Sequence, residues 1–120
     1  MKSKTEILNI IKHSDSSEAY HKFSTFPGFP VATDGIIALA EAAECFWLLD
    51  IIGSYQTDKN LYPDFQVWTL TVNHEYCTGI VYGYNDIELI VTQEIPYTDF
   101  PLDEVKLYLM NGVILLPSEY

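Results

Sequence analysis

The stretch from Thr33 to Tyr55 reads TDGIIALAEAAECFWLLDIIGSY and is the longest apolar segment of the chain. Alanine and leucine, the strongest helix formers, dominate its first half, so it predicts one long helix from Asp34 to Tyr55. Asp34 is a good N-cap, because its carboxylate can accept hydrogen bonds from the first-turn amides and suits the positive end of the helix dipole. The rest of the fold must be built around this helix.

The predicted helix carries apolar residues on both sides, which indicates that other elements cover it from more than one direction. It also contains three acids, Glu41, Glu44 and Asp50. A single charge at the middle of a bilayer costs about 2.5–3.5 kcal/mol, so these acids argue against a membrane span. We therefore expect a core helix.

Asp50 is the unusual residue of this helix, because a helical wheel puts it on the apolar face with Leu39, Phe46 and Trp47. One interpretation is a functional carboxylate in a pocket, which serves as an acid or a base. The other is a structural carboxylate that hydrogen-bonds a tyrosine, a tryptophan or backbone amides in the core. Both interpretations predict that Asp50 is buried.

The composition is that of a globular protein: 120 residues, of which 48% are hydrophobic and 14% aromatic. It predicts a single domain over residues 1–120, large enough to form a core without a metal or a disulfide. The N-terminus lacks the basic segment and apolar stretch of a signal peptide, so we expect a cytoplasmic location. Cys45 and Cys77 are accordingly predicted to be buried thiols.

The charge of the chain is strongly unbalanced, with 17 acids, six lysines and no arginine. Residues 1–59 hold eight acids and five lysines, whereas residues 60–120 hold nine acids and one lysine, Lys106. Arginine is the preferred residue for phosphate contacts, so its absence argues against direct binding to nucleic acid or to an anionic membrane. The expected partner is a basic protein surface, such as that of a nucleic-acid-binding protein, and simple solubility is the alternative reason for the charge.

The segments before the long helix are short. Ser3-Lys4-Thr5-Glu6 fits a capping box, and the apolar stripe behind it predicts a helix over residues 4–12. Aromatic alternation over residues 19–26 predicts an edge strand, and residues 31–32 predict a second short strand. Beyond residue 64 the hydrophobic period changes to two. Residues 65–73, 76–82 and 87–95 therefore predict three strands, which short turns join into an antiparallel meander.

The segment after residue 97 predicts a short C-terminal helix. Asp99 or Thr98 can cap it, Pro101 suits its first turn and Asn111-Gly112 suits its end. Its apolar stripe consists of Leu102, Val105, Tyr108 and Leu109. Residues 113–116 predict a final strand. The predicted fold is α+β: an antiparallel three- to four-stranded sheet packed against one long central helix, with short N-terminal and C-terminal helices.

Five blocks of the sequence resemble the motifs of an uncharacterised bacterial family catalogued as a domain of unknown function. They are TDG at 33–35, FWLLDII at 46–52, FQVWTLTV at 65–72, EIPYTDFPL at 94–102 and LPSEY at 116–120. The resemblance begins near residue 20 and leaves residues 1–18 as an appended helix and linker. It implies a compact domain that occurs on plasmids and other mobile DNA, and it brings no activity, cofactor or partner.

No catalytic or metal-binding constellation stands out in the sequence. His13, His21 and His74 lie far apart without the spacing of metal ligands, so we expect neither a metal nor another cofactor. The chain has no glycine-rich phosphate loop and no nucleophile elbow. The best enzymatic candidate is a carboxylate site around Asp50, and we assign no catalytic residues.

Tyrosines beside carboxylates suit a protein-binding surface, because tyrosine offers a large rigid contact area at a low entropic cost. The acidic half predicts a partner-binding set that consists of Glu94, Tyr97, Asp99, Asp103, Glu104 and Tyr108. We therefore expect a small, acidic, non-enzymatic protein-binding module. The association with mobile DNA that the resemblance implies suggests an anti-defence inhibitor of the anti-CRISPR or DNA-mimic type. The alternatives are a carboxylate-based enzyme or ligand-binding domain centred on Asp50, and a structural homo-oligomer such as a homodimer.

Overall fold

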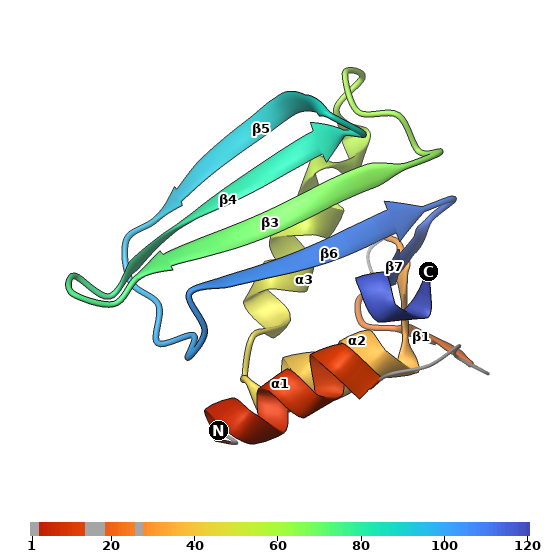
Figure 1. Cartoon of the computed structure of the whole chain (residues 1–120). Helices are drawn as coiled ribbons and strands as arrows, with labels where there is room; N and C mark the ends of the chain where they lie inside the picture. The colour runs from red at the N-terminus through yellow and green to blue at the C-terminus, as the bar shows by residue number, and fades with distance from the viewer. Residues whose placement is uncertain (1–2, 14–18, 26–27) are drawn as a thin grey trace.

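In the part of the chain that the structure describes, seven strands form one mixed sheet in the order β1-β2-β7-β6-β3-β4-β5 (Figure 1). The computed structural model describes residues 3–13, 19–25 and 28–120. The strands are β1 (Tyr20–Lys22), β2 (Val31–Thr33), β3 (Gln66–Asn73), β4 (Thr78–Asn85), β5 (Glu88–Ile95), β6 (Glu104–Met110) and β7 (Val113–Leu115). Neighbouring strands are antiparallel except β2 and β7, which run parallel. The α+β class and the β3-β4-β5 meander are confirmed, whereas a purely antiparallel sheet of three or four strands is wrong.

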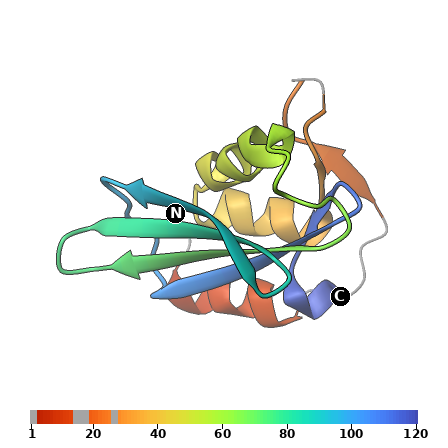
Figure 2. The ribbon, with the colours of Figure 1, turned by 90° about the horizontal axis from the view of Figure 1, so that it is seen from above.

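The helices lie mainly on one side of this sheet. They are α1 (Lys4–His13), α2 (Asp34–Ala42) and α3 (Phe46–Ser54), with two short 3-10 helices, η1 (Tyr55–Thr57) and η2 (Pro117–Glu119). Figure 2 shows α2 and α3 together beside the sheet, and α1 packs against α2 and η2. Within the described ranges, no helix is both long enough and apolar enough to cross a membrane.

The single long helix predicted over residues 34–55 is wrong, because the chain breaks between α2 and α3. Glu44 takes a left-handed backbone conformation with φ of 52°, and the Cys45 N–H donates to the Ala40 carbonyl oxygen at 2.9 Å. A hydrogen bond of this kind is typical of the end of a helix. Glu44 occupies the left-handed position at which glycine is commoner. The break frees α2 to pack against β2 and β7 while α3 runs in another direction behind β3 and β4 (Figure 1).

The C-terminal helix predicted after residue 97 is also wrong, because residues 104–110 form strand β6. Val105, Leu107 and Leu109 are buried and alternate with outward-facing residues, which is the period of a half-buried strand. They lie on the same buried face of the sheet as Trp68 of β3, which pairs with Leu107. Asn111-Gly112 makes the β6–β7 hairpin turn with both φ values positive, at 51° and 81°, as a two-residue type I′ turn requires.

The core lies between the helices and the inner face of the sheet, with Trp68 near its centre. The Trp68 ring packs over Gly83, where a Cβ would lie only 2.7 Å from the ring. The Trp68 Nε1–H donates to Gln66 Oε1 at 2.9 Å, so its one polar group is satisfied. Gln66 is itself buried and exchanges two 2.9 Å hydrogen bonds with the amide of Gln56. This polar network ties η1 to the sheet.

Candidate functional site

The β3–β4 turn and the connection from β5 to β6 lie at the same end of the sheet, on the left in Figure 1. Two backbone hydrogen bonds, each of 2.8 Å, join this connection to its neighbours: Thr98 N–H donates to the Cys77 carbonyl, and Val72 N–H donates to the Asp103 carbonyl. Thr98 and Phe100 are buried and anchor the connection. The backbone at this end is therefore held in a defined arrangement.

Five exposed carboxylates gather here, and we call this region the acidic end: Glu75, Glu94, Asp99, Asp103 and Glu104. The strand register places Glu94 of β5 and Glu104 of β6 on the same face of the sheet. One residue of β4 and one residue of β3 lie between them. Residues 60–105 contain no lysine or arginine. The Nε2 atom of His74 lies 3.0 Å from Asp103 Oδ1. The acidic end thus presents concentrated negative charge.

Two tyrosines stand out from the acidic end. Tyr76 lies in the β3–β4 turn and Tyr97 lies in the connection from β5 to β6, and each has 69% of its surface exposed. Exposed aromatic rings are enriched in protein interfaces, where they supply large contact areas. Negative charge and aromatic surface therefore occur side by side on one end of the molecule.

The structure brings together five of the six residues predicted for partner binding: Glu94, Tyr97, Asp99, Asp103 and Glu104. It separates Tyr108 from them, because Tyr108 lies four residues beyond Glu104 on β6, a distance of about 13 Å along an extended strand. Tyr108 instead packs with Phe65 and Tyr120, whose ring centroids lie 5.2 and 5.6 Å away.

Sequence reasoning missed Glu75 and Tyr76. The signal for them is topological: in an antiparallel sheet the β3–β4 turn must lie at the end where β5 stops and β6 starts. Because the sequence predicted a helix in place of β6, this topological argument could not place the β3–β4 turn beside the start of β6.

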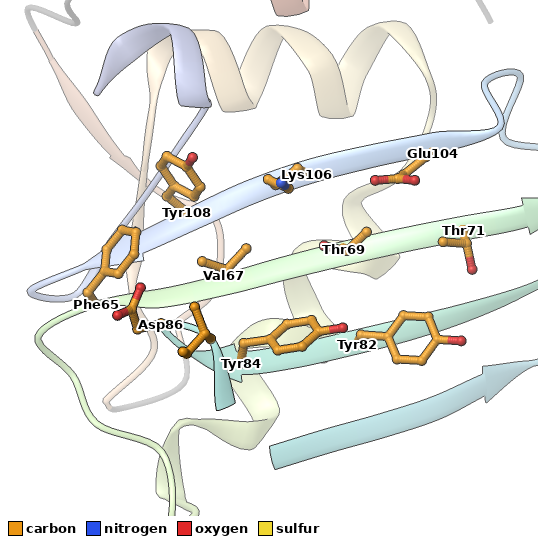
Figure 3. A pocket seen from close by; sticks show the side chains of 11 residues that line it. Phe65, Val67, Thr69, Thr71, Tyr82, Tyr84, Asp86, Glu104, Lys106 and Tyr108 are labelled. Carbon is orange, nitrogen blue, oxygen red and sulfur yellow. The ribbon is translucent and has the colours of Figure 1, made fainter. Parts of the chain in front are cut away.

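Tyr108 belongs to a hollow on the face of the sheet opposite α2 and α3 (Figure 3). The hollow has a volume of about 610 Å³ and is floored by outward-facing residues of β3, β4 and β6. Its lining includes four aromatic rings, those of Phe65, Tyr82, Tyr84 and Tyr108. Lys106, the one lysine of residues 60–120, rises from β6 between Tyr108 and Glu104. Glu104 belongs to both regions, so the hollow is continuous with the acidic end.

The burial predicted for Asp50 is wrong, because its side chain is exposed on α3. The break at Glu44 resets the helical phase, so α3 buries Leu48, Leu49 and Ile52 instead. Phe46, one turn before Asp50, is exposed as well. Neither the enzymatic nor the core interpretation of a buried carboxylate applies to this residue.

The two cysteines differ in their surroundings. Cys45 is buried as predicted, and this burial raises the pKa of its thiol from 9.0 to about 12, so the thiol of the folded chain stays protonated above pH 9 as well. The prediction for Cys77 is wrong, because it lies exposed in the β3–β4 turn. His21 pairs with Asp34, and no group of three or more potential metal ligands occurs among the residues that the structure describes.

The TDG and LPSEY blocks meet in space although they are far apart in sequence. Thr33, rather than the predicted Asp34, caps α2 and accepts a 3.3 Å hydrogen bond from the Ile36 N–H. The Thr33 hydroxyl donates to Glu119 Oε1 at 2.7 Å, and the Leu116 N–H donates to the same oxygen at 2.9 Å. These contacts fasten the C-terminal segment to the start of α2.

The chain belongs to a family of unknown function, DUF6876, whose model matches residues 5–120. The match extends over α1, which lies before the blocks that carry the resemblance. No curated protein and no solved structure matches the chain.

Proposed function

We propose that this member of the family is a non-enzymatic protein-binding module that docks its acidic end on a basic surface of another protein. The observation that carries the proposal is the grouping of five exposed carboxylates with Tyr76 and Tyr97, each 69% exposed. A group of carboxylates attracts a basic surface over about 10 Å at moderate salt, and this attraction raises the rate at which the two proteins meet. The two rings then supply apolar contact area.

The chemistry of the acidic end also indicates which class of partner it fits. Closely spaced carboxylates can occupy a groove that otherwise holds phosphates, so a nucleic-acid-binding protein is the fitting class of partner. Direct binding of nucleic acid by this chain is disfavoured by its net charge of −11. Given the mobile DNA on which similar sequences are expected to occur, the proposed role is an anti-defence inhibitor of the anti-CRISPR or DNA-mimic type.

The salt dependence of binding tests this proposal. A partner is captured from extracts of the native host by the immobilised chain, and its affinity is then measured over a series of salt concentrations. We expect the affinity to fall steeply with added salt, since the Debye length shrinks from about 10 Å at 0.1 M to about 3 Å at 1 M. An affinity that is insensitive to salt up to about 0.5 M contradicts electrostatic docking.

The hollow favours a second candidate function, the binding of a small ligand. Its volume of about 610 Å³ falls within the range of about 300–1,000 Å³ that ligand pockets occupy. Aromatic rings and Lys106 provide both apolar contact and one positive charge. A ligand screen by thermal shift tests this function: a hit should be lost in Tyr84→Ala, whereas a hit that persists in this variant binds elsewhere.

A further inference from the structure

Strand β5 forms the long free edge of the sheet. It is the last strand in the order β1-β2-β7-β6-β3-β4-β5, and no described strand pairs with its outer side. Figure 1 shows β5 along the upper margin of the sheet. The opposite edge, β1, is only three residues long, whereas β5 is eight residues long. Eight extended residues span about 26 Å, and the backbone N–H and C=O groups alternate regularly over residues 91–95, beyond the register shift in the pairing with β4.

The side chains along this edge determine which kind of extended segment can pair with it. Glu88 and Glu94 are exposed near its two ends, and Asp86 precedes it. Ile87 is 90% exposed and Leu89 is 48% exposed, so apolar contact area is available as well. Residues 60–105 supply no positive charge, so a segment that pairs here meets carboxylates and apolar groups.

We infer that β5 accepts an extended segment of the basic partner, which adds to the sheet as an eighth strand. The backbone groups of an edge are matched by an extended chain and not by a helix, because only an extended chain offers donors and acceptors at the spacing of a sheet. The register shift between β4 and β5 places Glu94 and Leu89 on one face of β5 and Glu88 on the other. Lysine or arginine on either face of the segment would therefore meet a glutamate, and an apolar side chain would meet Leu89. The inference rests on the proposed function, and Glu94 joins the two surfaces because it belongs to both β5 and the acidic end.

A second copy of the chain fits this edge less well. Each copy would bring Glu88 and Glu94 to the junction without a lysine, and each carries a net charge of −11. Charged side chains on an edge strand ordinarily prevent such self-pairing. The same carboxylates that oppose a second copy attract a basic segment.

Synthetic peptides test strand addition. The probe is an eight-residue peptide of alternating lysine and valine, and the matched control is the same peptide with its two central backbone nitrogens methylated. The methyl groups remove hydrogen-bond donors from both edges of the control without changing its charge or its side chains. We expect the control to bind about tenfold more weakly than the probe.

Amide hydrogen exchange in the whole chain locates the binding. The probe should slow exchange at alternate amides of β5, those that point outward, and leave exchange in α1 unchanged. Glu88→Lys, on the edge but outside the acidic end, should weaken the probe more than Glu104→Lys, in the acidic end but outside β5. Equal binding of the two peptides, no binding of either, or no added protection in β5 would overturn strand addition.

These outcomes separate the inference from the proposed function. If the captured partner binds Glu88→Lys as tightly as the wild type but loses binding to Asp103→Lys, docking through the acidic end stands and strand addition is wrong. If light scattering shows a dimer in which the β5 amides are protected without peptide, the occupant is a second copy, and the inference is wrong as well.

Discussion

The carboxylate of Glu119 occupies the space that a side chain at position 35 would need, since a Cβ built on Gly35 would lie 2.8 Å from it. The carboxylate stays there because Thr33 and the Leu116 N–H both donate to its Oε1 atom. Glycine in TDG and glutamate in LPSEY are therefore two halves of one contact. This contact gives a physical reason for both blocks without any catalytic role.

This contact makes Gly35→Ala destabilising, although the same change inside an exposed helix stabilises by roughly 0.5–1 kcal/mol. The added methyl group displaces the Glu119 carboxylate and breaks its hydrogen bonds, which costs about 1–3 kcal/mol. In the Glu119→Ala background, Gly35→Ala should become neutral or stabilising. Urea unfolding of the two single variants and the double variant measures the coupling. Additive effects of the two substitutions would show that the contact is energetically irrelevant.

Gly83 makes room for the indole of Trp68, which gives a second prediction. A methyl group at position 83 would lie 2.7 Å from a buried, rigid ring, so Gly83→Ala should lower the free energy of unfolding by about 1–3 kcal/mol. Thermal unfolding measures the loss. Trp68→Phe shortens the ring system, and in that background the cost of Gly83→Ala should shrink. An equal cost in both backgrounds would assign the effect to the backbone instead.

Asp50 and Leu49 are neighbours on α3 with opposite surroundings, because Leu49 is 1% exposed and Asp50 is exposed. Asp50→Asn should change the free energy of unfolding by less than about 0.5 kcal/mol. Leu49→Ala should lower it by about 2–5 kcal/mol. Denaturant titration of both variants under one set of conditions makes the comparison. A large loss in Asp50→Asn would mean that α3 presents a different face to the core.

The two thiols should differ in reactivity and in their effect on stability at alkaline pH. An alkylating reagent should modify Cys77 alone in the native chain and both cysteines in denaturant, as mass spectrometry can record. Burial holds the pKa of Cys45 at about 12 against 9.0 for an ordinary thiol. Below pH 9 the thiol is protonated in both states, so its contribution to stability is complete. Above pH 9 only the unfolded state ionises, so that contribution falls as the pH rises toward 12.

A comparison with Cys45→Ala isolates this pH effect from the titration of tyrosines and lysines. The stability advantage of the wild type over Cys45→Ala should be smaller at pH 10 than at pH 8. A constant advantage across this range would contradict the burial of the Cys45 thiol.

Local patterns in the sequence predict the β3-β4-β5 meander and α1 well, because each pattern there has a single interpretation. In α1, the Glu6 N–H donates to Ser3 Oγ at 3.2 Å, which is the serine half of the predicted capping box. The segment 104–110 is different, because buried Val105 and Leu109 fit a helical stripe as well as a strand. The pairing of β6 with both β3 and β7 decides between them, and such long-range pairing has no local signature.

The helix break at Glu44 could not be predicted either, because alanine and glutamate favour helix continuation and no glycine marks the end. Tertiary packing of α2 and α3 in different directions outweighs that local preference. The wrong prediction that Asp50 is buried follows directly from this break, which the sequence did not predict. The acidic end, in contrast, was largely predictable, because Glu94, Tyr97, Asp99, Asp103 and Glu104 are close in sequence and the sheet needed only to keep them at one end.

The most direct test of docking through the acidic end compares two double variants with the same change in net charge. Asp103→Lys with Glu104→Lys alters the acidic end, and Glu41→Lys with Asp50→Lys alters exposed positions on α2 and α3. Circular dichroism first establishes that both variants fold. Each is then immobilised, and mass spectrometry identifies the proteins that it retains from host extracts. We predict that the helix variant retains the basic partner of the wild type and that the acidic-end variant loses it. Retention by both variants, or loss by both, would contradict the proposed function.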